Sequence, residues 1–326
     1  MKIAITGGAG FIGTQLAKLL VADGHELALI DLKKSQAFPE SSIIADITDK
    51  ATLSEALKSS DVIYHLAAEH RDDVSPTSLY TEVNVEGGKN VIAAAKVHGI
   101  NTIIFSSSVA VYPLTPADPQ GGSNETHKPA PFNDYGHSKL ESEKTFLEWA
   151  EEDQNRTLVT MRLVATFGPG NRGNIYTLMN QIAAGKFVMI GDGSNRKSIA
   201  YVGNVAAFLR HALTLKPGAH LYNYADKPDL NMRDFVLSIR KTLGYEGMGL
   251  HMPYAVGLLV GGVFDGLAKI TGKKFPVSTI RIKKFCADTI VNADKLRETG
   301  FQAPYSLQDG LNNMIDAEFS TEKKAA

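Results

Sequence analysis

The chain begins MKIAITGGAGFIG, residues 1–13, and this stretch decides the fold. Lys2 to Thr6 is a short β-type run, and helical periodicity starts at Phe11. The glycines between them satisfy both G-x-G-x-x-G and T-G-x-x-G-x-x-G spacing, through Gly7, Gly8, Gly10 and Gly13. Glycines there allow a sharp turn, close approach of a pyrophosphate and a helix N-terminus that faces the anion. The stretch predicts a dinucleotide-binding strand, loop and helix; the alternative is a glycine-rich turn without a ligand.

Asp31 closes the next apolar run, Leu27 to Ile30. A carboxylate at that position accepts hydrogen bonds from both hydroxyls of the adenosine ribose and repels a 2′-phosphate. This favours NAD over NADP as the cofactor, although Lys33 and Lys34 follow closely and weaken the repulsion. The alternative is that Asp31 is a solvated surface residue.

The composition is that of a globular protein with a large core. The chain has 326 residues, of which 44% are hydrophobic, and a net charge of −1. Such a charge gives no general attraction for nucleic acid, so no nucleic-acid partner is expected. Cys286 is the single cysteine, which excludes an internal disulfide and a cysteine-based metal site. A strand that starts at residue 2 leaves no room for a signal peptide, and we expect a cytoplasmic protein.

β-type runs alternate with helical segments through the first half of the chain. We expect strands at 2–6, 26–31, 42–45, 61–66, 102–107 and 157–163, and helices near 11–23, 50–58, 77–98 and 134–152. This alternation predicts an α/β fold with a doubly wound parallel sheet of the Rossmann type. We expect an NAD-binding domain over 1–167, to which a segment near 197–225 returns, and a smaller C-terminal substrate-binding lobe over 168–326.

Residues 253–264, PYAVGLLVGGVF, are almost wholly apolar. The run is too short to span a bilayer before Asp265 interrupts it. It is expected to be a buried helix or a contact between protomers. The alternative is an apolar patch that touches the membrane or a lipid-linked substrate, in peripheral contact without stable insertion.

Tyr135 and Lys139 stand four residues apart, in YGHSK, on a segment expected to be helical. At this spacing the phenol and the ammonium share one face of the helix. A nearby ammonium, together with the positive nicotinamide of an oxidised cofactor, favours tyrosinate. Tyr135 can then be the acid or base for a hydroxyl that loses or gains hydride at its carbon. Ser106, Ser107 and Ser108 end a strand, where a hydroxyl can bind the same oxygen; the alternative is that both motifs are structural.

With these residues in place, the chain resembles the extended short-chain dehydrogenase/reductase family, the NAD-dependent epimerases and dehydratases of nucleotide sugars. The similarity runs nearly end to end. It is carried by TGGAGFIG (6–13), Asp46-Ile47, HLAA (65–68), NVEGGKN (84–90), SSSVAVY (106–112) and YGHSK (135–139). The resemblance implies that Ser108 is the catalytic hydroxyl and Tyr135 the acid or base. It also implies that Lys139 holds the nicotinamide ribose and lowers the pKa of Tyr135.

The same resemblance implies the remaining binding residues. Asn84 is expected near the substrate, and Asp46 and Ile47 are expected to flank adenine. The implied cofactor contacts are Gly7, Gly10, Phe11, Ile12, Gly13, Asp31, Asp46, Ile47, Leu66, Ala67 and Ala68, together with Tyr135 and Lys139.

Departures from the family pattern bear on the substrate. Val109-Ala110 stands where the family's dehydratases carry an Asp-Glu pair, so 4,6-dehydration is not expected. Ala165 stands where many sugar-nucleotide epimerases have an Asn that touches the diphosphate. The diphosphate-binding cation is expected to be Arg196, or Lys197 in the alternative register.

The predicted function is NAD-dependent epimerisation of a nucleotide sugar, by transient oxidation of a secondary hydroxyl and return of the hydride. The alternatives are a nucleotide-sugar 4-ketoreductase, an alcohol dehydrogenase of the 3β-hydroxysteroid type, and a non-catalytic NAD-binding protein. We also expect a homodimer. No metal is expected, because His65, His70 and His137 do not have metal-binding spacing with acidic residues.

Overall fold

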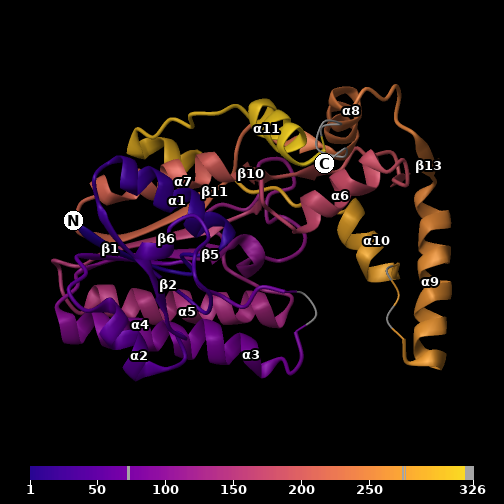
Figure 1. The fold of residues 1–326 in the computed structure, drawn as a ribbon. Helices are drawn as coiled ribbons and strands as arrows, with labels where there is room; N and C mark the ends of the chain where they lie inside the picture. The colour runs from indigo at the N-terminus through magenta and orange to yellow at the C-terminus, as the bar shows by residue number, and fades with distance from the viewer. Residues whose placement is uncertain (72–73, 274, 276, 320–326) are drawn as a thin grey trace.

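The computed structural model describes residues 1–71, 74–273, 275 and 277–319. Seven parallel strands form one central sheet (Figure 1), in the order β11-β6-β5-β4-β1-β2-β3. They are β1 (Lys2–Thr6), β2 (Glu26–Asp31), β3 (Ser42–Ile44), β4 (Val62–His65), β5 (Thr102–Ser108), β6 (Thr157–Leu163) and β11 (Gly218–Tyr224). The first six lie within one residue of the strands predicted from the sequence.

Helices cover both faces of this sheet, as a doubly wound fold requires. On one face α1 (Phe11–Ala22) packs beside α7 (Val202–His211). On the other face lie α2 (Lys50–Leu57), α4 (Gly87–His98) and α5 (Asp134–Glu151) (Figure 1). Each face has its own buried apolar core, so the amphipathic helices are held by burial against the strands. The predicted fold class is confirmed.

One predicted helix is broken. The segment expected to be helical over 77–98 begins as α3 (Ser78–Tyr80), passes through a π-helical stretch (Thr81–Glu86) and only then becomes α4. A π-helical turn shifts the helical register, which periodicity read from the sequence does not reveal.

The rest of the chain builds smaller elements beside the sheet. The helices are α6 (Asn174–Ala183), α8 (Met232–Thr242), α9 (Tyr254–Thr271), α10 (Thr279–Cys286) and α11 (Leu307–Phe319), with single turns at Pro39–Ser41, Val109–Val111, Ala212–Thr214 and Asp294–Thr299. Short strands pair in twos: β10 (Ile199–Tyr201) with β7 (Ala165–Phe167), β12 (Leu230–Asn231) with β9 (Arg196–Lys197), and β13 (Leu250–Met252) with β8 (Val188–Ile190). α6, α8 and α11 contribute to a third apolar core. The domain boundary at residue 167 stays a prediction.

Helix α9 contradicts the expectation that residues 253–264 are buried. Only 11% of it is buried, through Gly257 and Gly261. It packs against α10 at the side of the molecule, far from the sheet (Figure 1). Among the described residues it is the one helix long and apolar enough, by length and composition, to cross a membrane. The buried-helix interpretation is therefore wrong, because an apolar run does not show what covers it; a contact between protomers stays a prediction.

The strand order creates the place for a site. β1 pairs with β2 on one side and with β4 on the other. From β1 the chain passes to β2 and β3 on one side of the sheet, and it then crosses back to β4 on the other side of β1. In such folds a crevice opens at the carboxyl ends of the strands, at the point where the order reverses.

Candidate active site

A cavity of about 910 Å³ lies at this carboxyl edge. One part of its lining, here called the cofactor wall, comes from residues 7–13, 30–33, 45–47 and 66–70. Another part, here called the substrate wall, comes from residues 163–166, 171, 174, 197, 284 and 289–291. The predicted residues that line the cavity are Gly7, Gly10, Phe11, Ile12, Gly13, Asp31, Asp46, Ile47, Leu66, Ala67, Ala68, Ser108, Tyr135, Lys139 and Lys197.

The loop after β1 requires glycine at two positions. Gly7 has a φ of +72°, and a Cβ there would lie 2.8 Å from the backbone nitrogen of Ala67. A Cβ on Gly13 would lie 2.5 Å from the carbonyl oxygen of Gly7. The loop and the N-terminus of α1 are therefore packed more closely than any side chain would permit. A helix N-terminus presented behind a bare backbone fits a pyrophosphate.

Asp31 stands at the cavity wall, at the end of β2. Its Oδ2 accepts a hydrogen bond of 3.1 Å from the backbone N–H of Ala9, which ties the carboxylate to the glycine loop. A carboxylate has further lone pairs for the two hydroxyls of a ribose. Ile47 is buried against Gly87, while Asp46 is exposed at the same wall. Together with the glycine loop, these residues fit NAD.

Tyr135 and Lys139 project from the first two turns of α5. Asn133 caps this helix, since its Oδ1 accepts a hydrogen bond of 2.8 Å from the N–H of Gly136. A Cβ on Gly136 would lie 2.2 Å from the carbonyl oxygen of Ala110, in the turn that follows β5. Glycine thus lets α5 approach the end of β5, which brings the phenol and the ammonium to the cavity that the serines of β5 also line.

Lys139 is almost completely buried, with 2% of its surface exposed. Its Nζ lies 4.3 Å from the ring centre of Phe105. Burial lowers the pKa of Lys139 to about 7, against the opposing effect of the nearby Glu143 carboxylate. Burial, with the charge of Lys139, also lowers the pKa of His65 to about 3, so this imidazole is neutral at neutral pH. A partner with negative charge at the cavity therefore stabilises the ammonium of Lys139, and the ammonium stabilises that partner in return.

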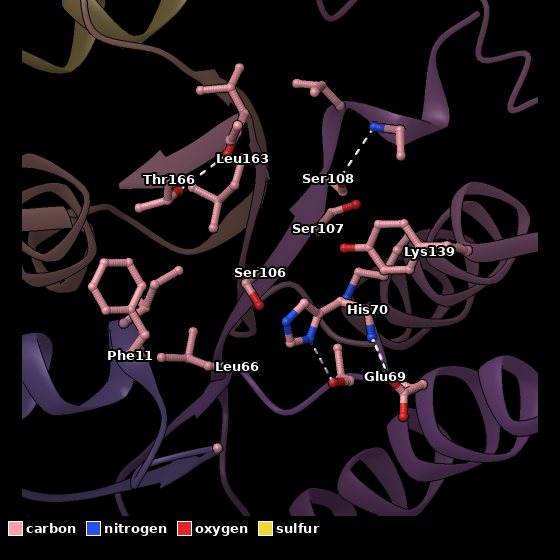
Figure 2. Close-up of a pocket in the computed structure, with 18 of the residues that line it drawn as sticks. Phe11, Leu66, Glu69, His70, Ser106, Ser107, Ser108, Lys139, Leu163 and Thr166 are labelled. Atoms are coloured by element: carbon pink, nitrogen blue, oxygen red, sulfur yellow. Dashed lines mark hydrogen bonds between the residues drawn. The ribbon is translucent and has the colours of Figure 1, made fainter. Parts of the chain in front are cut away.

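The three serines follow one another along β5 (Figure 2), and each has a different hydrogen-bond partner. Ser108 accepts a hydrogen bond of 3.1 Å at Oγ from the N–H of Ala110. This bond uses a lone pair and leaves the hydroxyl hydrogen of Ser108 to donate to a substrate oxygen. Ser107 instead donates to Oε1 of Glu143 at 2.5 Å, and Ser106 donates to the carbonyl of His65.

A buried ion pair beside Lys139 and Ser107 was not predicted as part of the site. Arg162 donates to both carboxylate oxygens of Glu143, at 2.9 and 2.7 Å. Its Nη1 also donates to the hydroxyl of Tyr112, which donates in turn to Asn223. The pair ties α5 to β5 and β6, so it holds Lys139 in position relative to the serines. The available signal was the position of Glu143 four residues after Lys139, on the same helical face.

Two residues predicted to bind substrate do not line the cavity. Asn84 is buried, and its Nδ2 donates to the carbonyl of Glu69 at 3.0 Å and to Oγ of Ser138 at 2.8 Å. It therefore joins α5 to the loop after β4. Arg196 donates to backbone carbonyls of the 119–120 segment. Both side chains bond to other parts of the protein, and substrate contact by either residue stays a prediction.

Lys197 does line the cavity, and so does Lys284, which the sequence suggested as a solvated residue or a contact of a diphosphate. Nζ of Lys197 donates to the carbonyls of Ala287 at 2.6 Å and of Lys284 at 3.0 Å. Burial lowers the pKa of Lys197 to about 8. Nζ of Lys284 lies 5.1 Å from the ring centre of Phe132. These two cations give the substrate wall its positive charge, which suits a diphosphate. Among the described residues, no group of three His, Cys, Asp or Glu could hold a metal ion.

Comparisons with known proteins show the family to which the chain belongs. The model of the NAD dependent epimerase/dehydratase family matches residues 3–225. The chain is 45% identical to the N-acetyl-alpha-D-glucosaminyl-diphospho-ditrans,octacis-undecaprenol 4-epimerase of Escherichia coli O157:H7, over 99% of this chain and 97% of that protein. It is 26% identical to a UDP-glucose 4-epimerase of Vibrio cholerae, over 97% and 95% of the two chains. The solved UDP-glucose 4-epimerase of Thermotoga maritima with UDP-glucose has the same fold, with a TM-score of 0.78, 19% identity and full coverage of both chains.

The chain therefore belongs to the NAD-dependent epimerase/dehydratase family. It is an NAD-dependent epimerase or oxidoreductase of the extended short-chain dehydrogenase/reductase type, and NAD is its cofactor, as the sequence predicted.

Proposed function

We propose that this protein is a 4-epimerase of an N-acetylhexosamine joined through a diphosphate to a polyprenol. The observation that carries the proposal is the 45% identity, over nearly the full length of both chains, to the enzyme of E. coli O157:H7 named for that reaction. Lys197 and Lys284 on the substrate wall support a diphosphate. A nucleotide sugar, the substrate class predicted from the sequence, shares the sugar diphosphate and differs in what the second phosphate carries.

The residues of the cavity account for the chemistry. The phenolate of Tyr135 takes the proton of the C4 hydroxyl, while the free hydrogen of Ser108 binds the same oxygen. NAD, held by the glycine loop and Asp31, would supply the acceptor for the hydride of C4 and the donor that restores it to the other face of the 4-keto sugar once that sugar has turned in the site. The buried ammonium of Lys139 favours the phenolate and holds its position. Val109-Ala110 supplies no carboxyl group to protonate a leaving hydroxyl, so the reaction ends with C4 inverted.

The substrate can be tested directly. Purified protein, with no added cofactor, is incubated with N-acetylglucosaminyl-diphospho-undecaprenol and, separately, with UDP-N-acetylglucosamine. The sugars are released and separated as N-acetylglucosamine and N-acetylgalactosamine. We expect epimerisation of the polyprenyl substrate with kcat/KM at least about tenfold higher, which corresponds to ~1.4 kcal/mol of preference. Turnover of the UDP-sugar alone would contradict the proposal, and Tyr135→Phe is the inactive control.

The expected location of the protein follows from this substrate. A polyprenyl diphosphate stays in the membrane, so we propose a cytoplasmic protein that works at the membrane surface, in peripheral contact through 253–264.

We also propose a homodimer: α4 and α5 lie side by side and expose Val97 and Leu147. Light scattering should give twice the chain mass of 35.2 kDa. A monomer at micromolar concentration would argue against the dimer.

A further inference from the structure

The outer face of α9 carries an uninterrupted apolar stripe. Its members are Val256, Leu259, Val263, Leu267 and Ile270, all exposed. They follow one another at intervals of three or four residues, so they lie along one side of the helix. Leu259 is 72% exposed and Ile270 is 83% exposed, which is unusual for large aliphatic side chains.

The opposite face of α9 is fixed to the rest of the protein. A Cβ on Gly261 would lie 2.8 Å from the backbone nitrogen of Thr279, and one on Gly257 would lie 2.7 Å from the side chain of Ile190. Oδ2 of Asp265 accepts a hydrogen bond of 3.1 Å from the N–H of Thr279. α9 and α10 therefore form a packed hairpin. To span a bilayer, α9 would have to leave these contacts and carry Asp265 into hydrocarbon.

The hairpin differs in charge from the rest of the chain. Residues 254–286 contain six Lys or Arg and one Asp, a net of +5, while the whole chain has a net charge of −1. Lys269, Lys273 and Lys283 of the hairpin are exposed. A second copy of the hairpin would be repelled by this charge. An anionic surface with an apolar layer beneath it complements both features.

We propose that the α9–α10 hairpin lies in the plane of an anionic phospholipid bilayer, with the stripe of α9 at the headgroup–acyl boundary and the lysines among the phosphates. The helix is 18 residues long, about 27 Å at 1.5 Å per residue, so it forms an extended contact. Lys284, in the last turn of α10, lines the active-site cavity, so docking brings the substrate wall to the depth of the headgroups. The benefit to turnover rests on the proposed polyprenyl substrate, but the binding itself does not.

Vesicle flotation of the full-length protein tests this surface. The vesicles are phosphatidylcholine alone, or phosphatidylcholine with about one third phosphatidylglycerol. We expect binding to the anionic vesicles that weakens as salt is raised, and little binding to the neutral ones. The double variant Leu259→Gln with Val263→Gln should bind the anionic vesicles at least about tenfold more weakly. Val21→Gln, which changes an exposed apolar residue on α1, is the control and should bind as the wild type does.

A second variant and a separate readout keep the test decisive. Lys269→Gln with Lys283→Gln removes two charges without touching the packed face, and it should lower binding and flatten its salt dependence. NAD affinity, unchanged in both variants, verifies folding. Absence of wild-type binding, or equal binding by the apolar double variant, would overturn the proposal. So would a dimer that the apolar variant dissociates, because the stripe would then be a protein contact. Vesicle binding without turnover of the polyprenyl substrate would overturn only the proposed function.

Discussion

The cofactor wall and the substrate wall line one cavity but are built in different ways. The cofactor wall is built around the glycine loop, where a Cβ on Gly7 or Gly13 would lie within 3 Å of other backbone atoms. The substrate wall consists of side chains from segments far apart in sequence, such as Thr166, Lys197 and Lys284. Consecutive residues of the sequence determine the glycine loop. The substrate wall, in contrast, forms only when the tertiary structure brings distant side chains together.

The largest expected effect comes from the residue between the two walls. Tyr135→Phe should lower kcat by a factor on the order of 10²–10⁴, the usual contribution of one general acid or base. NAD affinity should stay nearly unchanged, because the glycine loop and Asp31 are intact. Steady-state kinetics and a cofactor titration measure both quantities. Wild-type turnover in the variant would remove Tyr135 from the mechanism.

The substrate wall can be probed with two adjacent cations. Lys197→Met removes a buried cation that lines the cavity and should raise KM by about tenfold or more, the scale of a charged hydrogen bond. Arg196→Met changes the neighbouring residue, which faces the 119–120 backbone, and should alter KM less than about twofold. Equal effects of the two substitutions would erase the distinction drawn between their positions.

The cofactor wall should control the choice between NAD and NADP. In the wild type NAD should bind at least about tenfold more tightly than NADP, a difference of ~1.4 kcal/mol. Asp31→Ala should reduce this ratio to near unity, since the carboxylate that repels the 2′-phosphate is gone. Fluorescence titration of the NAD-free protein provides the two dissociation constants. A preference that survives the substitution would assign cofactor selectivity to another residue.

The smallest effect concerns the stability of the NAD-free protein. The pKa of Lys139 is about 7 in the folded protein and ordinary, near 10.5, in the unfolded chain. Below pH 7 the buried ammonium of Lys139 therefore lowers the free energy of unfolding by its full amount. This destabilisation declines as the pH rises toward 10.5. Lys139→Met should raise the melting temperature by a few degrees at pH 6 and by almost nothing near pH 10. Thermal unfolding at the two pH values measures this; a variant less stable at pH 6 would contradict the burial argument.

The same comparison explains how far the sequence could predict the structure. The glycine spacing, the strands and the Tyr135–Lys139 pair are local patterns. The strands and the glycine loop form as predicted, and Tyr135 and Lys139 lie on one helix, α5. Glycine is needed at 136 because of the carbonyl oxygen of Ala110. The role of Glu143, on α5, depends on Arg162, on β6. Such partners are remote in sequence. Asn84 and Arg196 were predicted at the substrate from a family pattern, whereas their actual partners are backbone groups and Ser138.

Isotope analysis at C4 of the product tests whether the hydride returns to the sugar within one site. Purified protein converts N-acetylglucosaminyl-diphospho-undecaprenol in D₂O without added cofactor, and the released sugar is analysed by NMR. We expect an equilibrium mixture of the two C4 epimers with no deuterium at C4, because the migrating hydrogen travels as hydride and never exchanges with solvent. Deuterium at C4, or turnover only when NADH or NADPH is supplied, with net reduction of a ketone, would contradict it.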